Sequence, residues 1–222
     1  MRIRQPLPAV LVALFCLIFH CSCAKHVERV EPRVEKIETF VFECPNKESY
    51  TVRSADNSAS LFLPMGFVSL PRVQSTSGMK YSDGTTTVWL RGTQAILNVG
   101  GKPLGACINN PRSAAWEKAR LDGVNFRAVG NHPGWYLEIT DNRSIVVGMD
   151  KEKKRYEFPF VAPKLSAADA KAVYETKKDS WKLVVVTTGQ ECRDLATGKL
   201  YNRTVTLKLN SKSYAGCGKE LD

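Results

Sequence analysis

Short apolar runs, each the length of one β-strand, recur from Thr39 onward and constrain the fold of this chain more than any other feature. Turn residues such as Ser82-Asp83-Gly84 and Gly100-Gly101 separate the runs at hairpin spacing. This pattern is typical of antiparallel strands and favours a small barrel over a parallel sheet. The first block contains FVFEC (40–44), SYTVR (49–53), SLFL (60–63), FVSL (67–70), TTTVWL (85–90) and QAILNV (94–99).

A second block of similar runs follows, so we expect an all-β protein: a small antiparallel β-barrel over residues 40–108, then a β-rich domain over 123–222. Residues 109–122 separate the blocks as a linker or short helix. The second block contains VNFRAVG (124–130), GWYLEI (134–139), SIVVGM (144–149), RYEFPF (155–160), WKLVVVTT (181–188) and YNRTVTLKLN (201–210).

One segment of the second block is open to two interpretations. Ser166 followed three residues later by Asp169 is typical of a helix N-terminus. Residues 172–176 can instead pair with residues 181–186 through a Lys-Lys-Asp-Ser turn. A helix and a hairpin therefore both remain expectations here.

The N-terminal residues have the features of an export signal. Arg2 and Arg4 precede an apolar run over residues 9–19, which has the length of a signal core and is too short to span a bilayer. We expect a signal peptide over 1–23. Its end fits a lipoprotein leader acylated at Cys23, which we favour over Cys21, or ordinary cleavage after Ala24.

Residues 24–39 carry balanced charge, lack aromatic side chains apart from histidine and are interrupted by Pro32, so we expect a charged tether. The protein is expected in the bacterial envelope, as an outer-membrane lipoprotein facing the periplasm or as a soluble periplasmic protein if it is not lipidated. The formal net charge is +10. The densest basic run (151–155) is interrupted by Glu152, so we expect a solvated hairpin tip and no nucleic-acid partner.

Four cysteines remain after the leader, and an exported chain favours disulfides. Cys44 and Cys107 bracket the first block, whereas Cys192 and Cys217 lie near the end of the second. This placement favours the pairs 44–107 and 192–217. A zinc site would need closely spaced pairs, which the sequence lacks.

The segment STSGMKYSDGTTTVWLRGTQAIL (75–97), inside the Cys44–Cys107 bracket, resembles the MliC/PliC family of bacterial inhibitors of c-type lysozyme over about residues 40–108. The resemblance implies an eight-stranded antiparallel barrel. It also implies that a loop serine and a basic residue engage the two catalytic carboxyl groups of lysozyme. By position in the motif these are Ser77 and Arg91.

The neighbours of these two residues complete the expected lysozyme-binding set. Gly78 permits close backbone approach, Lys80 adds a second cation, and Tyr81 lies in the same motif. For Tyr81, as for Trp89, a core or loop-support role is favoured over direct contact with lysozyme. The family usually has lysine where this chain has Arg91, which keeps the charge but changes its shape. Because this protein and most target lysozymes are both basic, long-range electrostatic repulsion opposes their encounter.

The second block resembles an uncharacterised bacterial envelope domain with a G-N-x-P-x-W motif and a C-x-D and G-C-G ending. The residues that carry this resemblance are FRAVGNHPGWYLEI (126–139), CRDLATGKLYNRTVTLKL (192–209) and YAGCGKEL (214–221). The resemblance implies a compact β-rich domain with a Cys192–Cys217 disulfide and supplies no activity.

Catalysis has little support in the sequence, because no triad, phosphate loop or HExxH motif is present. We expect neither an enzyme nor a cofactor or metal. The leading hypothesis is an exported, lipid-anchored inhibitor whose barrel occupies the cleft of c-type lysozyme. The alternative is an envelope module that binds a cell-wall fragment or a small apolar ligand without inhibiting lysozyme.

Overall fold

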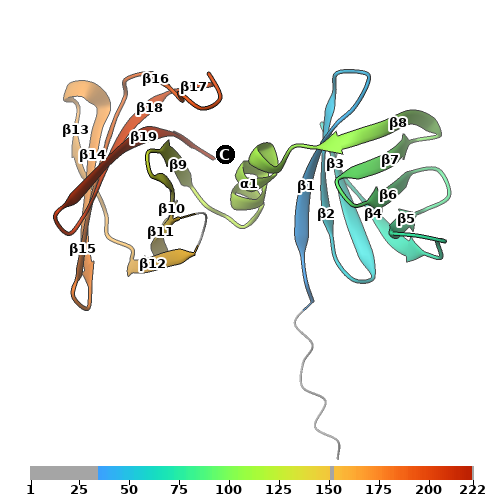
Figure 1. Ribbon diagram of the computed structural model, residues 1–222, viewed down its shortest axis with the longest axis horizontal. Helices are drawn as coiled ribbons and strands as arrows, with labels where there is room; N and C mark the ends of the chain where they lie inside the picture. Colours follow the sequence, from blue (N-terminus) through green and yellow to red (C-terminus); the bar gives the residue numbers. More distant parts are fainter. Residues whose placement is uncertain (1–34, 151–152, 222) are drawn as a thin grey trace, which may run out of the picture. The chain divides into compact units, whose positions relative to one another are not determined.

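The computed structural model describes residues 35–150 and 153–221, which form one helix, one short 3-10 turn and nineteen strands (Figure 1). The expected signal peptide, Cys23 and most of the expected tether lie outside the described residues. Within the described part of the chain, no helix has both the length and the apolar character needed to cross a membrane.

The first eight strands form a closed antiparallel barrel, as expected from the sequence (Figure 1). Each strand pairs with the next along the chain, and β1 closes the barrel by pairing Phe42 with Asn109 of β8. The strands are β1 (Glu38–Glu43), β2 (Ser49–Ser54), β3 (Ser58–Leu63), β4 (Gly66–Val73), β5 (Met79–Ser82), β6 (Thr87–Arg91), β7 (Gln94–Val99) and β8 (Lys102–Asn109).

Alternating apolar residues fill the barrel interior. In β6, Val88 and Leu90 are buried while Trp89 and Arg91 face outward, and β7 repeats the alternation. This is the two-residue period of a strand with one buried face. A disulfide between Cys44 and Cys107 ties the end of β1 to β8.

Helix α1 (Pro111–Leu121) follows the barrel in the segment expected to be a linker or short helix. The Asn110 side chain accepts a hydrogen bond from the Ser113 backbone N–H at 3.1 Å and caps the N-terminus, and Pro111 occupies the first turn. Lys118 and Arg53 of β2 both form salt bridges with Asp122 at the C-terminal end of the helix.

The remaining strands form a nine-stranded antiparallel sheet in the order β12-β11-β10-β9-β19-β18-β15-β14-β13, here called the C-terminal sheet, and a separate β16–β17 ribbon. The sheet strands are β9 (Phe126–Asn131), β10 (Gly134–Thr140), β11 (Ser144–Met149), β12 (Lys154–Pro159), β13 (Lys164–Ser166), β14 (Lys171–Lys178), β15 (Trp181–Thr188), β18 (Arg203–Leu209) and β19 (Lys212–Glu220). The ribbon strands are β16 (Cys192–Arg193) and β17 (Leu200–Tyr201).

The C-terminal sheet curls around its own hydrophobic core, with β12 near one edge contacting β14 near the other. The Thr176 hydroxyl of β14 donates to the Pro159 carbonyl of β12 at 3.0 Å. Leu137, Ile139 and Leu207 are fully buried on the concave face. A disulfide between Cys192 and Cys217, the second expected pair, ties the ribbon to β19.

Residues 172–186, for which the sequence allowed a helix or a hairpin, form a hairpin in the structure. Strand β14 pairs with β15 from Ala172–Thr187 to Lys178–Trp181, and only a 3-10 turn at Ala168–Ala170 precedes it. The apolar runs of the sequence do not predict strands β8 and β19. Pro103 and Gly105 interrupt the apolar pattern of β8, and β19 contains two glycines.

Candidate functional site

The Ser77 loop connects β4 to β5 at one end of the barrel and presents Ser77 to solvent. Gly78 has φ of +68°, in the left-handed region. A Cβ atom at this position would lie 2.1 Å from the Leu90 carbonyl oxygen and 3.6 Å from Cγ of Arg91. Only glycine lets the loop rest this closely on the end of β6.

Trp89 holds the Ser77 loop from the outer face of β6. Its indole N–H donates to the Ser77 carbonyl at 2.7 Å. The Lys80 ammonium lies 5.6 Å from the Trp89 ring centroid, and the Arg91 guanidinium carbon lies 5.0 Å from it. Both distances are within the range of cation–π interactions.

Four of the five residues expected to bind lysozyme therefore meet at one edge of the barrel. Ser77, Gly78 and Arg91 are exposed, and Lys80 is half-buried. We call these four residues, together with Trp89, the basic edge. A hydroxyl and two cations presented on an accessible edge can engage carboxyl groups in a partner's groove by hydrogen bonds and charge.

Tyr81 corrects the expected binding set. Its side chain is fully buried in the barrel core, and its hydroxyl donates to the Ala55 carbonyl at 2.8 Å. Burial raises the pKa of this phenol, so it stays protonated at neutral pH. Tyr81 supports the strand beneath the loop and has no surface to offer a partner.

Asp83 forms the turn at the opposite end of the β5–β6 hairpin. Its carboxylate accepts the backbone N–H groups of Thr86 at 2.6 Å and Thr85 at 2.9 Å. These hydrogen bonds, led by that of Thr86, lower the pKa of Asp83. The Asp-Gly part of the motif is thus a structural turn and lies away from the basic edge.

A second concave region, in which Trp116, Tyr136, Arg127 and Tyr201 gather, was not predicted from the sequence. The first three residues lie in the consecutive elements α1, β9 and β10, whereas Tyr201 comes from β17, much further along the chain, so no local spacing marks the set. Within the described part of the chain, no group of three or more His, Cys, Asp or Glu side chains could hold a metal ion.

An exposed cationic edge on a small closed barrel is chemically suited to contact with an acidic partner. In the comparison with known families, residues 42–104 match the family described as membrane-bound lysozyme-inhibitor of c-type lysozyme, or MliC. This match confirms the resemblance to that family for this part of the chain. The match includes the whole basic edge, supports a role as a lysozyme inhibitor and indicates a place in the cell envelope.

The family match covers less than a third of the chain and stops before helix α1. MliC is a family of inhibitors. Neither the curated proteins nor the solved structures provided a match. The relationship of the C-terminal sheet to an envelope family is not confirmed.

Proposed function

We propose that this protein inhibits c-type lysozyme by inserting Ser77 and Arg91 into the active-site cleft of the enzyme. This proposal rests on one observation: Trp89 and Gly78 hold Ser77 and Arg91 next to each other. The indole N–H holds the Ser77 carbonyl, and the Arg91 stem lies beside Gly78. The hydroxyl and the guanidinium are thus positioned together before a partner arrives, which reduces the entropic cost of binding.

The chemistry of the target cleft matches this edge. A c-type lysozyme works with one ionised carboxylate and one carboxyl group whose pKa is raised by an apolar pocket. Arg91 can make a forked, charge-assisted contact with a carboxylate, and the Ser77 hydroxyl can donate to or accept from its neighbour. Lys80 adds positive charge beside the same groove. Gly78 lets the loop backbone approach without a side chain.

Arginine at position 91 changes the contact without removing it. A guanidinium is planar and rigid and stacks on aromatic rings, whereas an ammonium is a compact point charge. The position of Arg91 over Trp89 uses this stacking. Arg91→Lys should therefore keep inhibition but weaken it, because the lysine loses the forked contact.

We also propose that the barrel is held at the membrane. In this scheme residues 1–23 are a signal peptide, Cys23 carries the lipid, and residues 24–39 are the tether. The barrel then spans 40–108, and the linker (109–122) and the second domain (123–222) follow. The protein faces the periplasm from the outer membrane. Acylation at Cys23 can be tested by mass spectrometry of the mature protein, which would show an unmodified N-terminus if the anchor is absent.

The inhibitor proposal is tested by titrating c-type lysozyme, acting on cell-wall substrate, with the purified protein. We expect inhibition by the wild type and at least a tenfold higher half-inhibitory concentration for Ser77→Ala with Arg91→Ala. Hydrogen bonds to charged groups contribute about 1.5–3 kcal/mol each, so a tenfold loss is a lower bound.

The matched control is Ser69→Ala with Lys102→Ala. Both residues are exposed, and the pair removes the same hydroxyl and the same charge. Lys102 lies at the end of the β7–β8 hairpin away from Arg91 and Gln94. Equal inhibition by the wild type and the Ser77/Arg91 variant would refute the site, and equal loss in the control would reduce it to general charge.

A further inference from the structure

A pocket of about 690 Å³ lies between helix α1, the convex face of β9–β11 and the loop of the β16–β17 ribbon. Its size is that of cavities that hold small molecules in proteins. Residues from Glu35 onward belong to one compact unit, and the pocket lies entirely within it. The inhibitor proposal uses none of the residues that line it.

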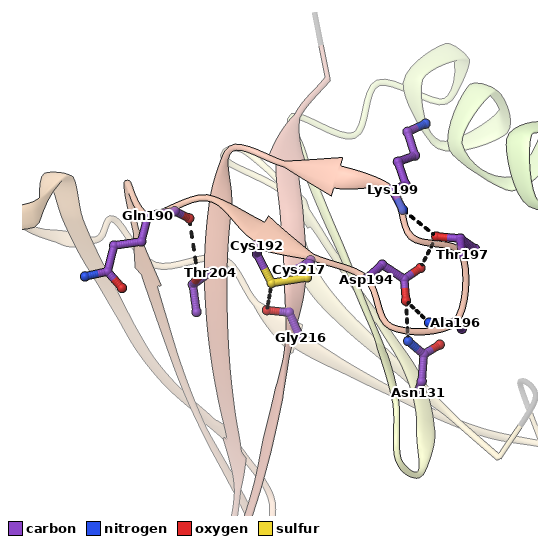
Figure 2. Close-up of a disulfide and its surroundings, with 10 residues drawn as sticks. All are labelled: Asn131, Gln190, Cys192, Asp194, Ala196, Thr197, Lys199, Thr204, Gly216 and Cys217. Atoms are coloured by element: carbon purple, nitrogen blue, oxygen red, sulfur yellow. Dashed lines mark hydrogen bonds between the residues drawn. A yellow bond between two sulfur atoms is a disulfide. The ribbon is translucent and has the colours of Figure 1, made fainter.

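The two sequence motifs of the second block meet at this pocket (Figure 2). The Asn131 side-chain amide, from G-N-x-P-x-W, donates to the Asp194 carboxylate, from C-x-D. Asp194 also accepts the Ala196 backbone N–H at 2.9 Å and the Thr197 hydroxyl at 2.7 Å. The Cys192–Cys217 disulfide fixes the base of the same loop. The motifs therefore build one wall.

Asp194 fastens this wall and does not act as a free carboxylate. Burial opposes its ionisation, but the hydrogen bonds from Thr197, Ala196 and Asn131 outweigh burial and lower its pKa. The ionised Asp194 side chain, with all three of these donors bound, thus holds the β16–β17 loop in its conformation. Lys199 follows on the same loop and extends away from the Asp194 carboxylate (Figure 2).

A layer of aromatic and guanidinium groups forms the floor and the helix wall. Trp116 of α1 stacks on Tyr201 with ring centroids 5.1 Å apart. The Arg127 guanidinium carbon lies 5.6 Å from the Trp116 ring and 4.9 Å from the Tyr136 ring, and Arg127 pairs with Glu138. These contacts pack the helix against the sheet at the edge of the pocket.

Gly148 lets Tyr136 lie flat across β11. A Cβ atom at this position would lie 2.0 Å from Cε1 of the Tyr136 ring. The Tyr136 ring is therefore part of the pocket floor, with the Arg127 guanidinium packed over it. The glycine is required by this packing, because its own backbone φ is unremarkable and any side chain would displace the ring.

The charge of the pocket rim is positive. Arg112 of α1 and Lys199 of the ribbon loop are exposed and line the opening. Among the described residues, neither forms a salt bridge. Arg127 is offset by Glu138. Asp194 is engaged by its three donors, and the charge of Arg112 also helps to lower its pKa. Lys199 and Arg127 are further positive charges of the lining. Two cations above an aromatic floor complement a molecule with a negative end and an apolar face.

We propose that this pocket binds a small carboxylate-bearing amphipathic molecule, with the carboxylate at Arg112 and Lys199 and the apolar part against the aromatic layer that lines the pocket. Two sources share this chemistry in an envelope: a muramyl peptide released from the cell wall, and a free fatty acid. The proposal does not depend on lysozyme inhibition, because the basic edge and the pocket share no residue.

Binding is measured by isothermal titration calorimetry with three probes on the full chain: muramyl dipeptide, decanoate and the uncharged disaccharide of N-acetylglucosamine. We expect binding of one carboxylate probe, which identifies the source, and at least tenfold weaker binding of the uncharged disaccharide. Arg112→Ala with Lys199→Ala should weaken the carboxylate probe at least tenfold and leave lysozyme inhibition unchanged.

Two further variants separate a site from general charge or misfolding. Lys177→Ala with Lys182→Ala removes two exposed cations from a cross-strand pair on β14 and β15 and should bind as the wild type does. Ala196→Trp, at an exposed position of the pocket loop, should block the pocket while circular dichroism stays unchanged.

The proposal is overturned if neither carboxylate probe binds the wild-type protein, or if the uncharged disaccharide binds equally well. It is also overturned if the Arg112/Lys199 variant binds as tightly as the wild type, or if the control pair loses as much affinity. Failure of lysozyme inhibition with intact probe binding would refute the inhibitor proposal and leave this one standing.

Discussion

The barrel and the C-terminal sheet are built from the same element, the antiparallel strand, and each contains one disulfide, yet they present their chemistry in opposite ways. The barrel places a serine and two cations on an exposed edge. Beside the C-terminal sheet, helix α1 and the β16–β17 loop place two cations around a hollow lined by aromatic rings. An exposed edge suits the cleft of another protein, whereas a hollow suits a small molecule.

The two regions also differ in how their sites are encoded. The basic edge comes from one hairpin and the loop before it, between Ser77 and Arg91. The pocket draws on α1, β9 and β10, which are consecutive in the chain, and on the β16–β17 loop, which lies much further along it. A site whose residues lie in one short segment can be recognised as a sequence motif, and the family match does cover the barrel that contains the basic edge.

The largest expected effects come from removing each disulfide, which tests whether the two regions depend on their own crosslinks. The disulfides close loops of 63 and 25 residues. The chain-entropy relation then predicts losses of about 4 kcal/mol for Cys44→Ala with Cys107→Ala and about 3.5 kcal/mol for Cys192→Ala with Cys217→Ala. Urea unfolding measures both values.

Lysozyme inhibition and probe binding test whether each disulfide supports only its own region. Under conditions where each variant is still folded, the Cys44/Cys107 variant should lose lysozyme inhibition and the Cys192/Cys217 variant should lose binding of the pocket probe. If each variant lost both readouts to the same degree, the two regions would be one cooperative unit, and the comparison drawn above would fail.

Gly78→Ala tests the close contact beneath the Ser77 loop. A left-handed φ costs a residue with a Cβ about 1–2 kcal/mol, and the clash with Leu90 adds the cost of overpacking, so we expect a loss of about 3 kcal/mol and of inhibition. Gly100→Ala is the matched control, because its φ is +57° and nothing lies within 4 Å. It should lose only about 1–2 kcal/mol and still inhibit lysozyme.

Tyr81→Phe separates the barrel core from the basic edge. The change removes the hydrogen bond to the Ala55 carbonyl and should cost about 1 kcal/mol by thermal unfolding. Lysozyme inhibition at a temperature where the variant is folded should not change. A tenfold loss of inhibition in a fully folded Tyr81→Phe protein would return Tyr81 to the binding set.

Asp122→Asn is expected to have the smallest effect and to depend on pH. Burial opposes ionisation of Asp122, but Lys118 and Arg53 together outweigh it and lower its pKa. Because the folded pKa is depressed, the contribution is present above the unfolded pKa of about 4 and is lost as the pH falls through the folded value. A partly exposed pair contributes up to about 1 kcal/mol, so unfolding at pH 7 should shift slightly and the shift should vanish near pH 2.

Strands with clear alternation were predictable from the sequence, whereas β8 and β19, in which glycine or proline breaks the alternation, were not. Strand β19 is central in its sheet, yet Gly216 and Gly218 remove the apolar alternation that marks a strand. The structure needs both glycines, because a Cβ atom at position 216 would meet the Trp135 ring at 2.7 Å and one at 218 would meet Phe126 at 2.7 Å. Packing between distant residues thus replaced the local strand signal.

The sequence alone was enough to predict the all-β class and to find the motif that contains the basic edge, because both depend on residues close in the chain. The placement of the cysteines favoured the two disulfide pairs that the structure contains. Tertiary packing was needed to bury Tyr81 fully, to place the Trp89 indole against the Ser77 carbonyl and to bring Asn131 to Asp194. The physical reason is register: side chains alternate between the faces of a strand, so a shift of one residue exchanges core for surface. Pairing between strands sets that register, and no short stretch of sequence specifies it alone.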